Sequence, residues 1–162
     1  MTEIEIRELK EEDIVPCAEM TIKSFPWTAF GLKMERAKKF FKDRLGIELI
    51  FVAVHQNEPV GYITIKRDIM FANYIRRMVV REDMRSKGIG AKLMRYVEEL
   101  AYSSGLPNVF LLTTTTNVKA IKFYLENGYQ IVGKIQDFVK RGMDEYILWK
   151  SKGTVDDFKL YD

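Results

Sequence analysis

A short loop with two glycines lies between an apolar segment and an amphipathic segment in the middle of the chain. Residues 76–100 read R-R-M-V-V-R-E-D-M-R-S-K-G-I-G-A-K-L-M-R-Y-V-E-E-L. Glycines lack the Cβ atom that would keep an anion away from the backbone, and free N–H groups at the start of a helix point towards such an anion. The loop from Arg85 to Gly90 therefore indicates a site that binds phosphate groups.

Basic residues are concentrated around this loop. The 162-residue chain has a net charge of +3, whereas residues 66–95 contain nine basic and three acidic residues, a net charge of +6. The remainder therefore carries −3. A local positive field suits a small molecule with several phosphates. A solvated basic face is one alternative, and nucleic-acid binding is another, although the segment lacks a stacking-aromatic or recognition-helix signature.

The loop differs from two widespread phosphate-binding sequences. The chain contains no G-x-x-x-x-G-K-[S/T] segment, so a Walker A loop is excluded. In the dinucleotide-binding fingerprint a third glycine follows Gly88 and Gly90, but this chain has Leu93 at that position. The loop by itself is therefore compatible with several phosphorylated ligands.

The periodicity of apolar residues predicts the elements that must position the loop. Strands are expected at 2–9, 49–55, 60–66, 71–80, 109–115, 129–139 and 143–149. Helices are expected from 11 onward, at 32–45, after the glycine loop and at 117–127, with an aromatic loop at 24–31. The expected buried helix positions are Ile14, Val15, Ala18, Ile22, Met34, Ala37, Phe40, Phe41, Leu45, Ile89, Leu93, Val97, Leu100 and Ala101. The 71–80 strand ends in residues that are apolar on both faces, which places it in the middle of a sheet.

Composition indicates one globular domain over residues 1–150 and a polar tail over 151–162. Hydrophobic residues make up 47% of the chain and charged residues 30%. No apolar run approaches the roughly 20 residues of a membrane helix, and the charged start of the chain is unlike a signal peptide. One cysteine and one histidine argue against a disulfide framework and against a metal site. These features predict a cytoplasmic protein with no metal and no membrane partner.

A second motif, N-V-K-A-I-K-F-Y-L-E-N-G-Y at 117–129, follows the glycine loop. The two motifs together resemble the GNAT superfamily of N-acetyltransferases, and the order of elements matches that family over residues 3–150. The resemblance implies an α+β GNAT fold. This fold has a central mixed, mostly antiparallel, twisted sheet of seven strands, flanked by about four helices in α/β/α layers.

The resemblance also implies a binding site for acetyl-CoA. Backbone amides of the loop would bind the CoA pyrophosphate, at Arg85, Ser86, Lys87, Gly88, Ile89, Gly90 and Ala91. The strand end formed by Met78, Val79 and Val80 would pair with the pantetheine arm and hold the thioester carbonyl. Asn117 would contact the cofactor near the pantetheine, and Tyr124 would lie beside its sulfur.

Simple chemistry supports a catalytic role for Tyr124. Asn117 and Tyr124 are seven residues apart, or two helical turns, so they share one helix face about 10.5 Å apart. A phenol with a pKa near 10 is protonated at neutral pH and can donate a hydrogen bond or a proton to the departing CoA thiolate. The alternative is a core tyrosine, because Ile121 and Leu125 flank it on the apolar side.

The group that deprotonates the amine departs from the family pattern. Many relatives use a glutamate on the fourth or fifth strand, where this chain has Tyr74 and Leu112. Proton removal would therefore pass through ordered water, with backbone carbonyls, Tyr74 or the threonines 113–116 as relays. Tyr74 is accordingly the second candidate catalytic residue.

The expected activity is that of an acyltransferase, an acetyl-CoA-dependent N-acetyltransferase in which a primary amine attacks directly in a ternary complex. The acceptor would be a protein N-terminus or a lysine. The segment D-F-V-K-R-G-M-D-E-Y-I-L at 137–148 resembles the closing hairpin of enzymes that acetylate protein N-termini, which favours the N-terminus. A small polyamine-type acceptor is the alternative. A non-catalytic acyl-CoA sensor is the alternative of another class, motivated by the absent glutamates. Many relatives form homodimers, which is a further expectation.

Overall fold

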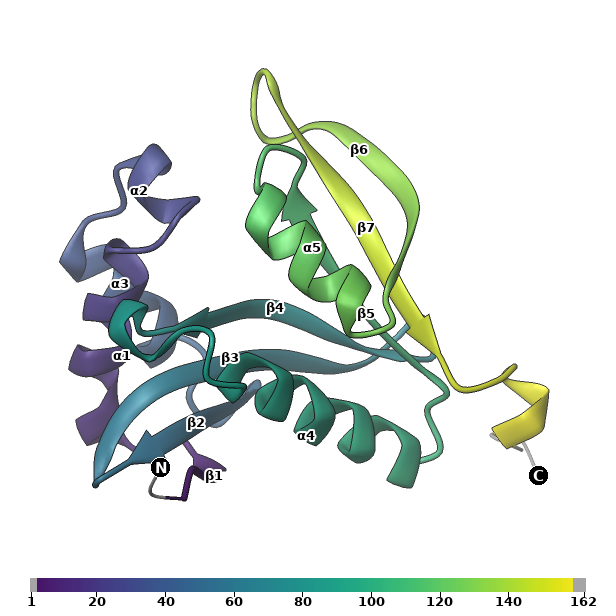
Figure 1. The fold of residues 1–162 in the computed structure, drawn as a ribbon, viewed down its shortest axis with the longest axis horizontal. Coiled ribbons are helices and arrows are strands. Elements are labelled where there is room, and N and C mark those ends of the chain that lie inside the picture. The colour runs from purple at the N-terminus through teal and green to yellow at the C-terminus, as the bar shows by residue number, and fades with distance from the viewer. Residues whose placement is uncertain (1–2, 159–162) are drawn as a thin grey trace. The chain divides into compact units, whose positions relative to one another are not determined.

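The computed structural model describes residues 3–158 and contains seven strands in the order β1-β2-β3-β4-β5-β7-β6 (Figure 1). The strands are β1 (Glu5–Glu8), β2 (Leu49–His55), β3 (Glu58–Ile69), β4 (Ala72–Val80), β5 (Asn108–Thr114), β6 (Gln130–Lys140) and β7 (Met143–Ser151). β4 and β5 are parallel, whereas β1–β2, β2–β3, β5–β7 and β6–β7 are antiparallel. The predicted mixed, mostly antiparallel sheet is confirmed, with β4 in the middle of the order.

The described residues form five α-helices, one more than the sequence predicts. They are α1 (Ile14–Ile22), α2 (Trp27–Phe30), α3 (Met34–Lys42), α4 (Ile89–Ser103) and α5 (Val118–Glu126), with 3-10 turns η1 (Glu11–Asp13), η2 (Glu82–Met84) and η3 (Asp156–Phe158). The additional helix, α2, lies in the segment predicted to be an aromatic loop. Gly31 ends it in the left-handed conformation at φ 65°, which glycine adopts without a steric penalty.

Two predicted core positions are wrong. Val15 is 48% exposed and Leu45 is 42% exposed. The helix predicted over 32–45 ends at Lys42, and the backbone then forms turns. The helical period therefore no longer determines which way the Leu45 side chain points.

Contacts divide the chain into two compact units. Unit 1 comprises residues 1–66 and 77–96, and unit 2 comprises residues 67–76 and 97–162. Strands β3 and β4 and helix α4 contribute residues to both units. The single domain over 1–150 stays a prediction. Of the predicted polar tail, Ser151 continues β7 and residues 156–158 form η3, whereas residues 159–162, like Thr2 of the first strand, lie outside the described residues.

Unit 1 has its core between the helices α1 and α3 and the strands β2 and β3. The two helices, drawn in purple and blue in Figure 1, lie side by side. Phe41 of α3 packs edge-on against Tyr62 of β3 with ring centroids 4.9 Å apart, and the Tyr62 hydroxyl hydrogen-bonds Thr21 Oγ1 at 2.6 Å. At the start of α1 the buried carboxylate of Asp13 accepts bonds of 2.7 and 3.0 Å from the Arg7 guanidinium. These contacts fix α1 on the strands.

Unit 2 is organised around β5, which pairs with β4 on one side and with β7 on the other. Helix α5 lies in front of β5 and β7 in Figure 1. Lys150 of β7 forms a salt bridge with Glu98 of α4, and its Nζ also donates to the Asn127 carbonyl at 2.9 Å. Lys150 thus fastens the carboxyl end of α5 to the strand.

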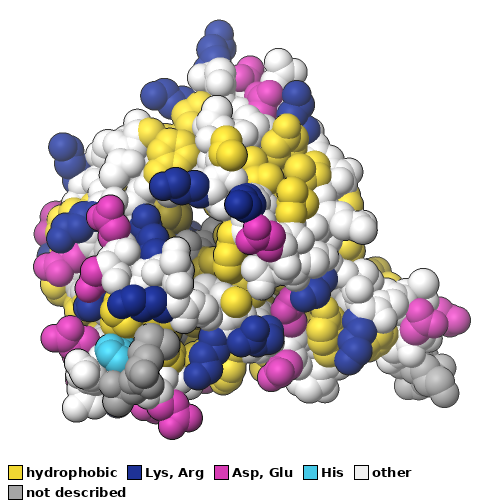
Figure 2. Space-filling view, in the orientation of Figure 1, with side chains coloured by type: hydrophobic (Ala, Val, Ile, Leu, Met, Phe, Trp, Pro, Cys, Tyr) yellow, Lys and Arg dark blue, Asp and Glu magenta, His cyan; other side chains and the backbone are white. Residues whose placement is uncertain are grey.

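Apolar side chains reach the surface of unit 2, in yellow over α5 and the β6–β7 hairpin in Figure 2. The exposed large apolar residues of α5 and β6 are Val118, Leu125, Ile131, Val132, Phe138 and Val139.

Across residues 3–158, the helices are too short or too polar to cross a membrane.

Candidate active site

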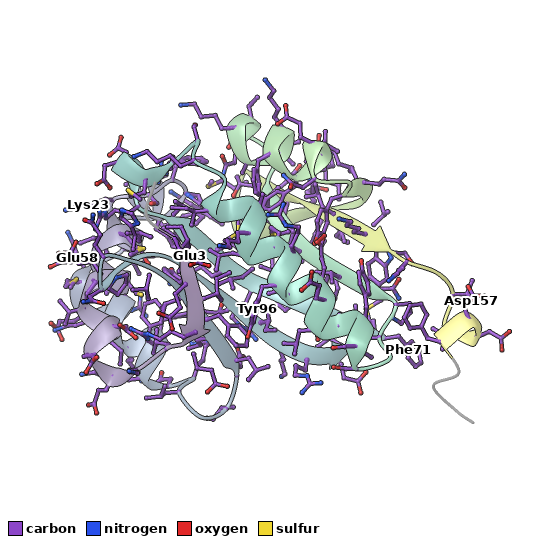
Figure 3. The ribbon with its side chains drawn as sticks, turned by 60° about the horizontal axis from the view of Figure 1, so that its bottom comes forward. Glu3, Lys23, Glu58, Phe71, Tyr96 and Asp157 are labelled. Atoms are coloured by element: carbon purple, nitrogen blue, oxygen red, sulfur yellow. The ribbon has the colours of Figure 1, made fainter. Side chains whose placement is uncertain are left out.

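The carboxyl end of β4 is held firmly within unit 1. The Arg81 N–H donates to the Val60 carbonyl at 2.8 Å, and the Arg81 side chain forms an ion pair at 3.4 Å with Glu58, the residue labelled in Figure 3. A Cβ atom at Gly61 would lie 3.1 Å from the Val79 carbonyl oxygen, which shows how closely β3 approaches this strand end. Val79 is buried in the unit 1 core, whereas Met78 and Val80 are half-buried. The predicted thioester-binding strand end is therefore rigidly supported.

The glycine loop leads from this strand end into α4. Residues 85–88 are exposed, whereas Ile89 at the start of the helix is buried. Ser86 and Gly88 adopt positive φ values of 60° and 81°. The Lys92 N–H donates to the Gly88 carbonyl at 3.0 Å, so the N–H groups of residues 89–91 precede the first helical hydrogen bond of α4. N–H groups in the first turn of a helix and the positive end of its dipole together suit an anion.

Arg85 braces the loop through its side chain. Its Nε donates to the Val80 carbonyl at 3.0 Å, and its Nη2 donates to Ser24 Oγ at 2.9 Å. Ser24 is itself buried and donates to the Met20 carbonyl at 2.7 Å. The guanidinium therefore links the loop to β4 and to the segment after α1.

Farther along α4, the ring of Tyr96, which Figure 3 labels, packs on the ring of Phe51 of β2 with centroids 4.8 Å apart.

Asn117 is the N-cap of α5, as the sequence predicts. Its side-chain Oδ1 accepts a hydrogen bond from the Ala120 N–H at 3.4 Å. The cap uses the oxygen of the amide, which leaves the NH2 group as a donor for a ligand. Capping and cofactor contact can therefore coexist in one side chain.

This arrangement gives a test that separates the two roles of Asn117. We expect Asn117→Ala to lower the free energy of unfolding by about 1 kcal/mol, because a cap is lost, whereas Asn117→Ser retains a cap and changes stability little. Both variants lose the amide donor, so both should weaken acetyl-CoA binding alike. Urea denaturation and titration calorimetry measure the two effects, and wild-type affinity in Asn117→Ser would dismiss the amide contact.

Tyr124 lies in unit 2 near the end of α5 and is 8% exposed. Its ring makes edge contacts with Phe123 and Tyr129 at centroid distances of 5.3 and 6.1 Å. Burial raises the pKa of Tyr124 to about 12. The phenol therefore stays protonated throughout the neutral range and can act as a hydrogen-bond donor.

Tyr74 belongs to an aromatic stack across three strands of unit 2. Its ring stacks on Phe110 of β5 at 4.9 Å, and Phe110 stacks on Trp149 of β7 at 5.4 Å. The Arg76 guanidinium lies 5.6 Å from the Tyr74 ring. The stack fixes the orientation of Tyr74, and its role as a proton relay stays a prediction.

The sequence pattern did not single out Glu145 on β7. This carboxylate is 5% exposed and accepts a 3.0 Å hydrogen bond from Thr114 Oγ1 of β5. Burial raises its pKa above the usual value, and the Thr114 hydrogen bond opposes that shift. The sequence offered one indication of this residue, a carboxylate at the start of the otherwise apolar run E-Y-I-L-W.

Residues 3–158 contain no group of three or more histidine, cysteine or acidic side chains suited to a metal ion.

Comparison with known proteins identifies the family. Residues 14–129, more than two thirds of the chain, match the sequence model of the acetyltransferase (GNAT) family. The chain therefore belongs to the GNAT acetyltransferase family. The predicted acyltransferase class and its co-substrate, acetyl-CoA, are those of this family.

Three curated relatives illustrate the range of similarity. The chain is 35% identical over 94 residues to N-acetylaspartate synthetase of Danio rerio, covering 57% of this chain but 33% of that protein. It is 29% identical over 120 residues to N-alpha-acetyltransferase 50 of Danio rerio, covering 70% and 71%. It is 28% identical over 139 residues to aminoalkylphosphonate N-acetyltransferase of Salmonella typhimurium, covering 75% and 90%. The match thus spans a third of the first relative and most of the other two.

Solved structures share the fold. A GNAT-family protein from Desulfovibrio desulfuricans superposes with a TM-score of 0.78 at 14% identity, covering 92% of this chain and 99% of that one. A streptothricin-acetyltransferase-like protein from Bacillus anthracis, solved in complex with acetyl coenzyme A, superposes with a TM-score of 0.61 at 25% identity, covering 65% and 64%. The predicted GNAT fold is confirmed.

Proposed function

We propose that this protein transfers the acetyl group of acetyl-CoA to a primary amine by direct attack in a ternary complex. The observation that carries the proposal is the exposed glycine loop, where the N–H groups of residues 89–91 precede the first helical hydrogen bond of α4, next to a β-strand end held by Arg85. Those donors suit the CoA pyrophosphate, and the Met78–Val80 strand end would pair with the pantetheine arm. In unit 2, Asn117 would contact the cofactor and Tyr124 the sulfur.

Direct transfer is favoured over a covalent acetyl-enzyme. The single cysteine, Cys17, is fully buried in the unit 1 core, and burial raises the pKa of its thiol. A buried thiol of raised pKa supplies little thiolate and is a poor nucleophile. The amine would therefore attack the thioester itself.

For the acceptor, the proposal favours a protein N-terminus or a lysine, with a small amine as the second candidate. The similarity to N-alpha-acetyltransferase 50 supports the first, and that to aminoalkylphosphonate N-acetyltransferase supports the second. Exposed aromatic residues that could bind a peptide occur at Phe25 before α2 and at Phe138 near the tip of the β6–β7 hairpin. The proposal includes a cytoplasmic location and a homodimer.

The test is amine-dependent release of CoA. Protein and acetyl-CoA are incubated with aspartate, 2-aminoethylphosphonate, spermidine and peptides with free N-termini, and the products are weighed by mass spectrometry. We expect a mass gain of one acetyl group on one class of amine, with an equal amount of free CoA. Binding of acetyl-CoA without amine-dependent release would instead support the acyl-CoA sensor, and steeply salt-dependent binding of DNA or RNA would support a nucleic-acid partner.

A further inference from the structure

One face of the β4–β5–β7 sheet in unit 2 can be traced from its aromatic stack to a buried carboxylate. Tyr74 pairs with Phe110, and Phe110 pairs with Trp149, in the strand register. Side chains alternate between the two faces of a sheet along each strand. The face of the stack therefore continues through Leu112 and Thr114 on β5, and through Ile147 and Glu145 on β7.

Within residues 3–158 Glu145 forms no salt bridge, although Arg76 of β4, two positions beyond Tyr74, is a basic residue on the same face. Directly opposite Glu145 are Thr114 on β5, which donates the 3.0 Å hydrogen bond, and Ile135 on β6. Asp144, its strand neighbour, alternates to the other face and forms an ion pair with Lys134 at 3.6 Å. Burial and the Thr114 hydroxyl are the influences on the pKa of Glu145.

An unpaired carboxylate inside a sheet has an energetic cost that packing does not explain. Burying an ionised group without a counter-charge disfavours folding, and an apolar side chain at this position would avoid the cost. Carboxylates in such environments are enriched at functional sites, where a raised pKa suits proton transfer near neutral pH. Glu145 also lies on the face that carries Tyr74 and Leu112, the two strand positions at which this chain lacks a glutamate.

We propose that Glu145 is the general base that deprotonates the acceptor amine, an inference that rests on the proposed acetyltransferase function. The acceptor enters as an ammonium ion, and the Glu145 carboxylate takes one proton, directly or through one water. The amine lone pair then forms the C–N bond to the acetyl carbon, and the C–S bond breaks to release the CoA thiolate. The second amine proton neutralises the thiolate, and the Glu145 proton passes to solvent.

Lys150 shows which face of the sheet helix α5 covers. It is one residue beyond Trp149, so it alternates to the opposite face, where it bonds the Asn127 carbonyl at the end of α5. Helix α5 with Tyr124 therefore packs on the face opposite to Glu145.

The test compares pH profiles of kcat/KM for the wild-type protein, Glu145→Gln and Thr114→Val, with the acceptor that the wild type uses best. A base that must be ionised gives the wild type an acidic limb and a plateau above it. Glu145→Gln should lower kcat/KM at pH 7 by about 100-fold or more and should remove the plateau, so that the rate rises tenfold per pH unit up to the pKa of the amine. Thr114→Val should move the acidic limb to higher pH, because the hydrogen bond that stabilises the carboxylate is lost.

Controls separate catalysis from structure. Glu126→Gln removes an exposed carboxylate of α5 and should leave the profile unchanged. Thermal unfolding checks that Glu145→Gln folds, and Thr114→Val provides the independent readout if it does not. An unaltered profile with only a raised KM in Glu145→Gln would overturn the base assignment. Absence of amine-dependent CoA release by the wild type would overturn the acetyltransferase proposal itself.

Discussion

Replacement of Tyr124 by phenylalanine is expected to lower the turnover of acetyl transfer by about 100- to 1,000-fold, the usual effect of losing one donor to a developing negative charge. Acetyl-CoA binding should change by less than about twofold, because the aromatic ring and its contacts with Phe123 and Tyr129 are retained. A donor that acts only in the transition state lowers kcat and kcat/KM together. Steady-state kinetics and titration calorimetry with acetyl-CoA measure both quantities.

The raised pKa of Tyr124 specifies what kind of donor it would be. With a pKa of about 12, the phenol is a much weaker acid than a thiol, whose ordinary pKa is about 8.5. Complete proton transfer to the thiolate is therefore unfavourable, and hydrogen-bond donation is the favoured role. Because the phenol stays protonated well above neutral pH, the wild-type rate should not decline between pH 7 and pH 10 through ionisation of this residue.

Tyr129 provides a matched control. It is also buried, at 2% exposure, and its hydroxyl has no hydrogen-bond partner among the described residues. Tyr129→Phe removes a buried unsatisfied group, so it should leave turnover unchanged and should not reduce stability. Equal turnover in the wild type and Tyr124→Phe over a panel of amines would remove Tyr124 from the mechanism.

Local sequence patterns were sufficient to predict most of the fold. The run L-I-F-V-A-V-H predicted β2 with both ends correct, because the turn at Gln56 and Asn57, which both adopt positive φ, bounds it closely. The cap at Asn117 located the start of α5 in the same way. Caps, turns and apolar periods involve residues that are close in the sequence, so they can be recognised without knowledge of the tertiary structure.

Contacts between distant residues could not be predicted. Arg85 and Ser24 are 61 positions apart, and nothing in either segment indicates that the guanidinium braces the loop. Glu145 and Thr114 are 31 positions apart and meet through the register of β5 and β7. A slip of one residue would move Glu145 to the other face of the sheet. The base candidate therefore became visible only when the register was known.

The second large effect is expected at Gly88 in the loop. We expect Gly88→Asp to weaken acetyl-CoA binding by at least about 100-fold, because its carboxylate would lie beside the anion that the N–H groups of residues 89–91 are proposed to bind. A Cβ atom at Gly88 would meet no atom within 4 Å outside its chain neighbours, so the loop has open space beside this position. The remaining cost is backbone strain at φ 81°, on the order of 1 kcal/mol of stability.

Gly46 allows that strain to be separated from binding. It lies in the turn after α3 with φ 78°, and a Cβ atom there would also meet nothing within 4 Å. Gly46→Asp should therefore lose a similar amount of stability and bind acetyl-CoA like the wild type. Chemical denaturation compares the two stabilities, and titration calorimetry compares the two values of Kd.

Gly88→Asn separates charge from shape at the same position. Asparagine tolerates the left-handed backbone about as well as aspartate but carries no charge, so we expect a much smaller loss of affinity. The difference between the two variants should shrink as salt is raised, because the exposed carboxylate is screened. If Gly88→Asp binds acetyl-CoA as tightly as Gly46→Asp does, the pyrophosphate lies elsewhere. A loss specific to the charged variant would indicate that the loop recognises an anion through its backbone, which is the feature on which the choice of acetyl-CoA as donor depends.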